Sequence, residues 1–242
     1  MKTNILGVQF DNYTVEEAIN KSIESLENKK GFVIYTPNPE IVNVTKKDKD
    51  FAGILNSADI VTPDGIGIVY ASRILKGNIK YRAPGFDIAK GIIEKLNERA
   101  GSVYLFGGKP TVAEAAAENL KKEYKNLVIC GTQDGYFKDD TEIISSISQA
   151  EPDLLLVCLG APKQEKWIYE NKGKLNAGIL IGAGGSIDVL AGQAKRAPEF
   201  FTKHGLEWLY RLIKQPSRIK RMIKLPLFLI DVILKGERNN AC

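Results

Sequence analysis

Histidine and cysteine are scarce in this chain of 242 residues. His204 is its only histidine, and its three cysteines, Cys130, Cys158 and Cys242, form no Cys-x-x-Cys pair. Structural zinc sites and disulfide frameworks need several such residues at close spacing, so the sequence disfavours both. A histidine-based nucleophilic triad would have to use His204 as its base.

Long hydrophobic runs are also missing. No segment approaches the roughly 20 apolar residues that are needed to span a bilayer. The N-terminal sequence Met-Lys-Thr-Asn-Ile-Leu-Gly lacks the apolar core of a secretory signal peptide. These absences lead us to expect a cytoplasmic protein.

Common nucleotide-cofactor and metal motifs are absent as well. The loops Gly107-Gly108-Lys109 and 182–186 (Gly-Ala-Gly-Gly-Ser) match neither the Walker A loop nor the GxGxxG dinucleotide fingerprint. Asp48-Lys49-Asp50 has the spacing of an Asp-x-Asp metal site, but it lies in a charged segment that is typical of a solvated surface. We therefore predict neither a bound metal nor a cofactor.

The charge of the chain is concentrated at one end. The net charge is +5, and residues 196–242 contain ten Lys/Arg and four Asp/Glu, a balance of +6, so the rest carries −1. Basic residues alternate there with aromatic and aliphatic ones, before the apolar segment 225–234. This pattern is typical of contact with an anionic membrane surface or a pyrophosphate. Packing as a helical subdomain explains it equally well, whereas nucleic acid is disfavoured because no nucleic-acid motif is visible.

Predicted strands and helices alternate along residues 3–190. The strands at 103–106, 154–158 and 178–181 are apolar throughout, as expected when helices cover both faces of a sheet. The pattern predicts an α/β fold with a Rossmann-like, mostly parallel sheet and helices on both faces. The predicted strands are 3–11, 31–35, 59–62, 102–106, 127–130, 153–158 and 178–181.

The alternation stops near Arg196. The residues that follow look helical and are marked by prolines at positions 198, 216 and 226. We therefore expect two parts, an α/β catalytic core of residues 1–195 and a basic, amphipathic helical appendage of residues 196–242.

Six loops share one composition, in which glycine, proline or small residues accompany a few polar side chains. The carboxyl ends of parallel strands meet at one edge of the sheet, where open α/β folds bind their ligands. Glycine-rich loops before helices also favour phosphate groups, because helix amides and the helix dipole attract anions. The polar and glycine residues of these loops are Thr36, Asn38, Asp64, Arg82, Asp87, Gly107, Gly108, Gln164, Gly184 and Gly185.

Asp64 is the most informative of these residues. It follows the predicted strand 59–62 within Thr-Pro-Asp-Gly (62–65), directly before a helical pattern. A carboxylate at this edge can act as a catalytic base, and a glycine beside it lets a substrate approach the backbone. Aspartate in such a turn is also a common helix N-cap, and this stretch alone favours the cap.

Eight motifs, spread in order over nearly the whole chain, carry a resemblance to a known family. They are Thr36-Pro-Asn-Pro-Glu-Ile, Pro63-Asp-Gly-Ile-Gly, Arg82-Ala-Pro-Gly-Phe-Asp, Phe106-Gly-Gly, residues 152–167, Gly182-Ala-Gly-Gly-Ser-Ile-Asp, Gly192-Gln-Ala-Lys-Arg-Ala-Pro and Gly205-Leu-Glu-Trp-Leu-Tyr-Arg-Leu. With them the chain resembles the WecG/TagA/CpsF family of bacterial glycosyltransferases, and it is most similar to members that transfer N-acetylmannosamine. Pro39 stands where relatives often carry alanine, a neutral variation.

The resemblance implies a reaction and a cellular setting. N-acetylmannosamine would move from UDP-N-acetylmannosamine to undecaprenyl-diphosphate-linked N-acetylglucosamine in wall teichoic acid synthesis. The β-1,4 linkage would form with inversion and without a metal. The appendage would attach the protein to the inner face of the cell membrane, and the cores would associate as dimers or trimers.

The resemblance also assigns roles to individual residues. Asp64 would be the general base, which favours a catalytic role over a cap. The sugar and acceptor site would be lined by Thr36, Asn38, Arg82 and Gln164. The diphosphate would be held from the appendage by Arg211, Arg218 and Arg221. The nucleotide would lie near Gly184, Gly185 and Asp188, and we add Gly107 and Gly108 because of their strand-to-helix loop.

Each assignment has an alternative in ordinary structural chemistry. Thr36 and Asn38 can cap the following helix, Arg82 can form a surface ion pair, and Gln164 can be an early helix residue. A related transferase that uses UDP-N-acetylmannosaminuronic acid or UDP-glucose is the alternative function, because the donor sugar rests on the resemblance alone. A non-catalytic membrane-binding module is a third reading, and it predicts that Asp64→Asn leaves function intact.

Overall fold

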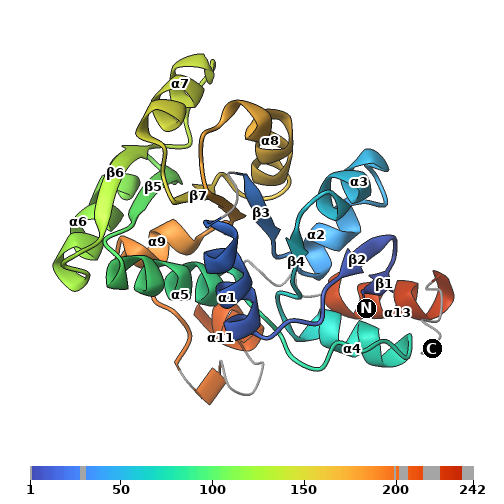
Figure 1. Cartoon of the computed structure of the whole chain (residues 1–242). Coiled ribbons are helices and arrows are strands. Elements are labelled where there is room, and N and C mark those ends of the chain that lie inside the picture. Colours follow the sequence, from blue (N-terminus) through green and yellow to red (C-terminus); the bar gives the residue numbers. More distant parts are fainter. Residues whose placement is uncertain (1, 28–30, 199, 202–206, 215–223, 236–242) are drawn as a thin grey trace.

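A six-stranded, entirely parallel β-sheet forms the centre of the computed structural model (Figure 1), which describes residues 2–27, 31–198, 200–201, 207–214 and 224–235. The strands lie in the order β4-β3-β8-β7-β5-β6. The fold is therefore α/β and Rossmann-like, as the alternation predicts. The strands are β3 (Phe32–Tyr35), β4 (Ile60–Val61), β5 (Ser102–Gly107), β6 (Val128–Gln133), β7 (Leu154–Cys158) and β8 (Ile179–Gly182).

Helices follow the strands closely in the sequence. Helix α1 begins with a capping box, in which Thr14 and Glu17 each accept a hydrogen bond from the other's backbone N–H. The helices are α1 (Val15–Ser25), α2 (Pro39–Val44), α3 (Asp50–Asn56), α4 (Ile66–Ile74), α5 (Gly85–Glu98), α6 (Val112–Glu123), α7 (Thr141–Ala150), α8 (Lys163–Asn171), the 3-10 turn η1 (Lys172–Lys174), α9 (Ser186–Leu190), α11 (Glu207–Lys214) and α13 (Lys224–Lys235).

The strand side chains alternate between two hydrophobic layers. Tyr35 and Phe106 belong to one layer, whereas Ile34 and Leu105 belong to the other. Because side chains along a strand point to opposite faces, an uninterrupted apolar strand supplies both layers. Helices α7 and α8 contribute to the first layer, and helices α1, α5, α6 and α9 contribute to the second. The sheet is thus covered on both faces.

Two predicted strands differ from the structure. The segment 3–11 is a hairpin of β1 (Thr3–Ile5) and β2 (Val8–Phe10), because Leu6 and Gly7 both have positive φ, of 51° and 90°, and reverse the chain. Strand β6 continues past Gly131 instead of ending at residue 130. Gly131 lies opposite Tyr104, and a Cβ atom there would be 2.2 Å from the Tyr104 ring, so the glycine makes room for an aromatic side chain.

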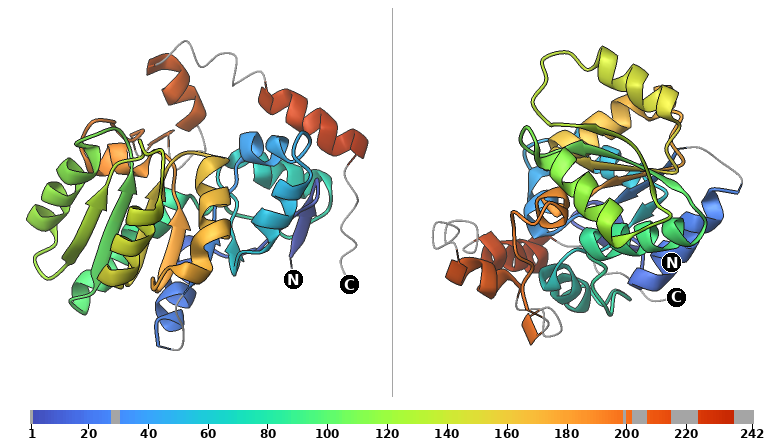
Figure 2. Two further views of the ribbon diagram at one scale, coloured as in Figure 1. Left: turned by 90° about the horizontal axis from the view of Figure 1, so that it is seen from above. Right: turned by 90° about the vertical axis from the view of Figure 1, so that its left-hand side faces the viewer.

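The last helix, α13, packs on the core beside α4 and α2 (Figure 2). Phe228 and Val232 are fully buried in the same hydrophobic layer as the hairpin. A Cβ atom on Gly67 of α4 would lie 2.5 Å from Cδ1 of Leu225, so the helices approach closely where α4 lacks a side chain. None of the helices described here has the length and hydropathy that a membrane span requires. The division at residues 195 and 196 stays a prediction.

Candidate active site

The first and last strands of the sheet, β3 and β8, are neighbours at its centre. Strand β4 lies on the outer side of β3, whereas on the other side the chain runs from β5 out to β6 and back through β7 to β8. After β3 the chain enters α2, which contributes to the first hydrophobic layer, and after β8 it enters α9, which contributes to the second. Loops that leave neighbouring strands toward opposite faces of a sheet mark a switch point, which is where α/β proteins bind ligands. The predicted site residues fall into two loop groups, one on each side of it.

The first group, named the Asp64 loops, consists of residues 36–38, 62–65 and 82–85. The backbone N–H of Asp64 donates to the Pro37 carbonyl at 3.3 Å, and that of Ala83 donates to the Pro63 carbonyl at 2.8 Å. The Thr62 hydroxyl donates to the Ala83 carbonyl at 3.0 Å. These bonds connect three segments that are distant in the sequence, and they bring Thr36, Asn38, Asp64 and Arg82 to one end of the sheet.

Asp64 does not occupy the N-cap of the helix that follows it. Helix α4 begins at Ile66, and its N-cap position is held by Gly65, whose φ of 94° suits glycine. The Asp64 side chain is half-buried, and its backbone is tied to the loop after β3. The interpretation of Asp64 as the N-cap is therefore wrong. Its role as a base stays a prediction, now without its main structural alternative.

Thr36 and Asn38 lie in the loop between β3 and α2. The Thr36 side chain is buried against the first turn of α5, and a Cβ atom on Gly85 would be only 2.5 Å from Thr36 Oγ1. Asn38 Oδ1 accepts hydrogen bonds from the backbone N–H groups of Glu40 and Ile41, at 2.9 and 3.1 Å, and thus caps α2. Capping, one of the two roles considered for Asn38, is present, and its contact with substrate stays a prediction.

Arg82 joins the Asp64 loops to the appendage. Its Nη1 lies 3.1 Å from Glu207 Oε2 in α11, and both side chains are more than four-fifths buried, at 18% and 17% exposure. Arg196 forms an ion pair with Asp87 and lies over the Phe86 ring, with 5.0 Å from Cζ to the ring centroid. The start of α5 and the start of the appendage are thus connected by four charged side chains.

The second group, named the glycine loops, follows β5, β6, β7 and β8. The Gly108 N–H donates to the Cys158 carbonyl at 3.2 Å, and the Gly135 N–H donates to the Gly108 carbonyl at 2.9 Å. A Cβ atom on Gly107 would be 2.3 Å from the Cys158 oxygen, so close strand packing requires glycine at this position, and its contact with a nucleotide stays a prediction. In contrast, a Cβ atom on Gly184 would meet no atom of the residues that the structure describes within 4 Å.

The start of α9 also has few neighbours among the described residues. A Cβ atom on Gly185 would contact only Asp188 Oδ2 of these residues, at 3.6 Å, and Asp188 itself is half-buried in the first turn of the helix. The N–H groups of Ala183 and Ser186 donate to the Val157 and Ala183 carbonyls, so the group that this loop presents most clearly is the Asp188 carboxylate. A carboxylate in this position can accept hydrogen bonds from the hydroxyl groups of a ligand.

Gln164 and Glu165 connect the glycine loops to the end of β3. Its side chain is 3% exposed, and its Oε1 accepts a hydrogen bond from the Gly184 N–H at 2.9 Å. Its Nε2 donates to Glu165 Oε1, also at 2.9 Å. The Tyr35 hydroxyl, at the end of β3, donates to the Glu165 carbonyl at 3.0 Å. Gln164 is therefore part of a buried polar network and not an ordinary helix residue.

Glu165 is the main residue of the site that the sequence did not single out. It is 2% exposed, and desolvation by burial raises the pKa of its carboxyl group to about 7. The sequence does contain a signal for its burial. At helical spacing one face of α8 carries Gln164, Glu165, Ile168 and Asn171, and all four are buried. The partners Arg196 and Glu207 were also missed, because ion pairs between distant segments leave no local signal.

Three predicted residues belong to the appendage. Arg211 lies in α11, whereas Arg218 and Arg221 lie outside the described residues. Within the described part of the chain, no three His, Cys, Asp or Glu side chains gather as a metal site would require. The roles of the three arginines, like the predicted independence from metals, stay predictions.

The fold and the two loop groups define an α/β protein whose predicted site residues follow the carboxyl ends of parallel strands on both sides of a switch point. The family model described as "Glycosyl transferase WecG/TagA/CpsF family" matches residues 3–241. The chain belongs to this family, as its motifs predict, and it is a glycosyltransferase.

Several named proteins are similar to this chain along most of its length. It is 39% identical over 214 residues to the N-acetylglucosaminyldiphosphoundecaprenol N-acetyl-beta-D-mannosaminyltransferase of Bacillus subtilis (strain 168), covering 88% of this chain and 83% of that protein. It is 33% identical over 239 residues to the protein of the same name from Staphylococcus aureus (strain MW2), covering 98% of this chain and 94% of that protein. The similarity thus extends through the appendage.

Proposed function

We propose that this glycosyltransferase moves N-acetylmannosamine from UDP-N-acetylmannosamine to undecaprenyl-diphosphate-linked N-acetylglucosamine, in wall teichoic acid linkage-unit synthesis. The names of the relatives support the sugar and the acceptor. The observation that carries the mechanism is the position of Asp64, a half-buried carboxylate outside the helix cap, in loops that three segments hold together. The reaction proceeds with inversion and gives a β-1,4 linkage.

Asp64 acts as the general base in this proposal. A sugar hydroxyl is a weak nucleophile, and a positioned carboxylate can take its proton as the attack proceeds. The acceptor O4 forms a bond to the anomeric carbon, its proton moves to Asp64, and the bond from the anomeric carbon to the phosphate oxygen breaks. The electron pair of that bond leaves with UDP from the opposite face. No metal takes part.

The remaining predicted residues bind the substrates. Thr36, Asn38, Arg82 and Gln164 line the sugar and acceptor site, and the glycine loops with Asp188 hold the nucleotide. The negative charge of the departing diphosphate is neutralised by Arg211, Arg218 and Arg221, because charge-assisted hydrogen bonds to phosphate stabilise the leaving group. The ion pair between Arg82 and Glu207 supports this arrangement, since it shows the appendage beside the Asp64 loops.

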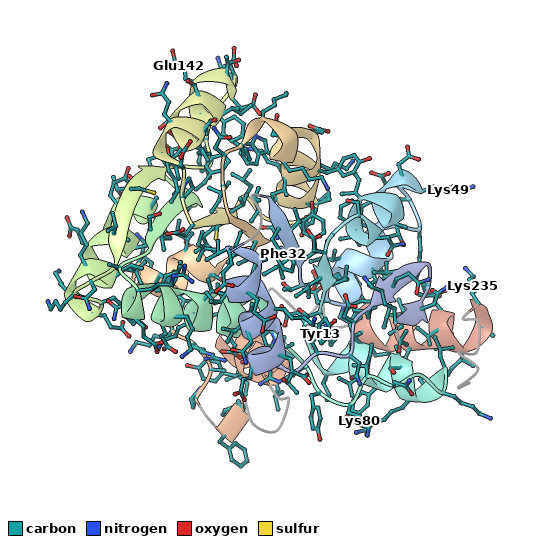
Figure 3. The ribbon with its side chains drawn as sticks, in the orientation of Figure 1. Tyr13, Phe32, Lys49, Lys80, Glu142 and Lys235 are labelled. Atoms are coloured by element: carbon teal, nitrogen blue, oxygen red, sulfur yellow. The ribbon has the colours of Figure 1, made fainter. Side chains whose placement is uncertain are left out.

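The protein works at the inner face of the cell membrane, where its lipid-linked acceptor lies. Helix α13 supports this part of the proposal, because its buried face packs on the core while four large apolar residues face outward. They are Leu227, Ile230, Ile233 and Leu234, with 54%, 50%, 63% and 73% of each residue exposed. Figure 3 shows the labelled Lys80 and Lys235 side chains extending from the same half of the molecule. The expected dimers or trimers stay a prediction.

The test is release of UDP from UDP-N-acetylmannosamine in EDTA, with and without the lipid-diphosphate N-acetylglucosamine acceptor. We expect acceptor-dependent release that EDTA does not abolish. In the Asp64→Asn variant kcat should fall at least about 100-fold, the usual contribution of a general base, while UDP affinity changes little. Asp50→Asn, at an exposed position of α3, is the matched control and should keep full turnover.

Each other outcome has a definite meaning. Near-normal turnover by Asp64→Asn would contradict the mechanism. Release only from UDP-N-acetylmannosaminuronic acid or UDP-glucose would keep the enzyme class and change the donor. Release that EDTA abolishes would contradict the metal-free reaction.

A further inference from the structure

Glu165 lies at the junction of three parts of the proposed site. Its carboxyl group accepts from Gln164 Nε2, its backbone carbonyl accepts from the Tyr35 hydroxyl at the end of β3, and Gln164 in turn accepts from the Gly184 N–H. We propose that Glu165 is a positioning residue for sugar transfer, which fixes the orientation of the Gln164 amide and thereby the glycine loop 182–186.

The orientation of the Gln164 amide follows from its two partners. The Gly184 N–H is a donor and requires the amide oxygen, so the amide nitrogen must find an acceptor on the other side. Glu165 Oε1 is that acceptor, at 2.9 Å. In the opposite orientation the amide NH₂ group of Gln164 would face the Gly184 N–H, and its amide oxygen would face Glu165 Oε1, so neither pair could form a hydrogen bond. The carboxyl group therefore selects one of two amide orientations of similar shape.

Packing limits the other movements of the Gln164 side chain. A Cβ atom on Gly182 would be 3.1 Å from Gln164 Nε2, so the amide lies directly against the end of β8. Gln164 is 3% exposed, and solvent has little access to replace Glu165 as the acceptor. Loss of that acceptor would leave the Nε2 group unpaired, and the Gln164 side chain would turn away from Gly184.

Glu165 does not stabilise the fold. Its Oε2 atom is buried and has no hydrogen-bond partner among the described residues. A buried carboxyl group with an unpaired oxygen is destabilising compared with an apolar side chain of the same shape. A polar residue that disfavours folding is expected where it serves a functional site. In Glu165 the second oxygen, Oε1, accepts the hydrogen bond from Gln164 Nε2, and Gln164 in turn binds the Gly184 N–H.

The experiment is a double-mutant cycle between Glu165 and Gln164, measured as kcat and KM for the UDP-sugar donor. Glu165→Met keeps the size of the side chain and removes the acceptor, whereas Glu165→Gln keeps an acceptor oxygen. Gln164→Ala and the double variant complete the cycle. Glu170→Met makes the same chemical change at an exposed position of the same helix, and it should leave activity and Tm unchanged.

We expect Glu165→Met to lower kcat/KM about 10- to 100-fold, as for loss of a partner that leaves a buried donor, the Gln164 amide, unsatisfied, while its Tm stays within about 4 °C of the wild-type value. Glu165→Gln should restore activity to within about threefold. In the Gln164→Ala background, Glu165→Met should change kcat/KM less than about threefold, because coupled residues do not act additively.

Additive effects of the two substitutions would overturn the proposal, as would full activity of Glu165→Met or a loss that follows a lowered Tm. Because the inference rests on the proposed function, the same cycle is also measured on the dissociation constant of UDP. Absence of turnover in the wild-type protein would refute the proposed reaction alone. Additive changes in UDP affinity would refute the role of Glu165 alone.

Discussion

The buried carboxyl group of Glu165 makes the stability of the fold depend on pH. Burial raises its pKa from an ordinary 4.5 to about 7. Between these values the folded protein keeps a proton that the unfolded chain releases, so the free energy of unfolding falls as the pH rises. The Glu165→Gln variant lacks this titration. The difference in the free energy of unfolding between the variant and the wild-type protein should therefore shift by about 2 kcal/mol in favour of the variant as the pH rises from about 5 to about 8.

This prediction can be checked by urea unfolding of both proteins at the two pH values. Glu170→Gln, an exposed position of the same helix, is the control and should show the same difference from wild type at both. A pH-independent effect of Glu165→Gln would mean that the carboxyl group ionises normally in the folded state.

The position of Asp64 could be predicted from the sequence, whereas its surroundings could not. A strand, a Pro-Asp-Gly turn and a helix place it at the carboxyl edge of the sheet. Whether Asp64 caps helix α4 depended on the backbone of Gly65, which occupies the N-cap position, and a sequence pattern does not report this conformation. The burial of Glu165 was not predicted for a related reason. A glutamate among other charged residues is normally exposed, and only its helical spacing from Ile168 and its position next to Gln164 indicate the buried face of α8.

Most of the fold follows from local patterns. The apolar strands β5, β7 and β8 predict a parallel sheet because both of their faces must be covered. Local patterns failed where a contact between distant residues decided the structure. The ring of Tyr104 fills the space opposite Gly131, so a residue that resembles a turn lies inside β6. The order of strands is also non-local, and it alone makes β3 and β8 neighbours.

The close packing of α13 on α4 depends on a glycine. A Cβ atom on Gly67 would be 2.5 Å from Leu225 Cδ1 and 2.7 Å from Pro39 Cγ, and the proline ring cannot turn aside. We expect Gly67→Ala to displace the first turn of α13 and to lower the free energy of unfolding by about 1–3 kcal/mol. Chemical denaturation measures the loss, and limited proteolysis reports faster cleavage of the C-terminal segment.

Gly53→Ala in α3 is the matched control for this substitution. A Cβ atom there would meet no atom of the described residues within 4 Å, so the change should stabilise the helix by about 0.5–1 kcal/mol. Equal stability of the Gly67→Ala and wild-type proteins would contradict the close approach of α13 to α4.

In the proposed membrane contact, helix α13 would orient the whole molecule. Its inner face, with Phe228 and Val232, completes the core, so the helix stays folded against the protein while its outer face is open. The outward residues Ile230, Ile233 and Leu234 lie near one another on the helix, at a spacing of three or four. Shallow insertion of such a face, assisted by a net positive charge of the chain, is typical of interfacial helices.

Replacement of Ile230, Ile233 and Leu234 by glutamine should separate membrane binding from catalysis. We expect binding to vesicles that contain anionic phospholipid to fall at least about tenfold, because each buried apolar side chain contributes more than 1 kcal/mol. Activity on a short-chain, water-soluble acceptor should be unchanged, since the substituted side chains point away from the core. Val128→Gln, at an exposed position of β6, should affect neither property. Vesicle co-sedimentation makes the decisive comparison, and undiminished binding of the triple variant would place the membrane contact elsewhere on the protein.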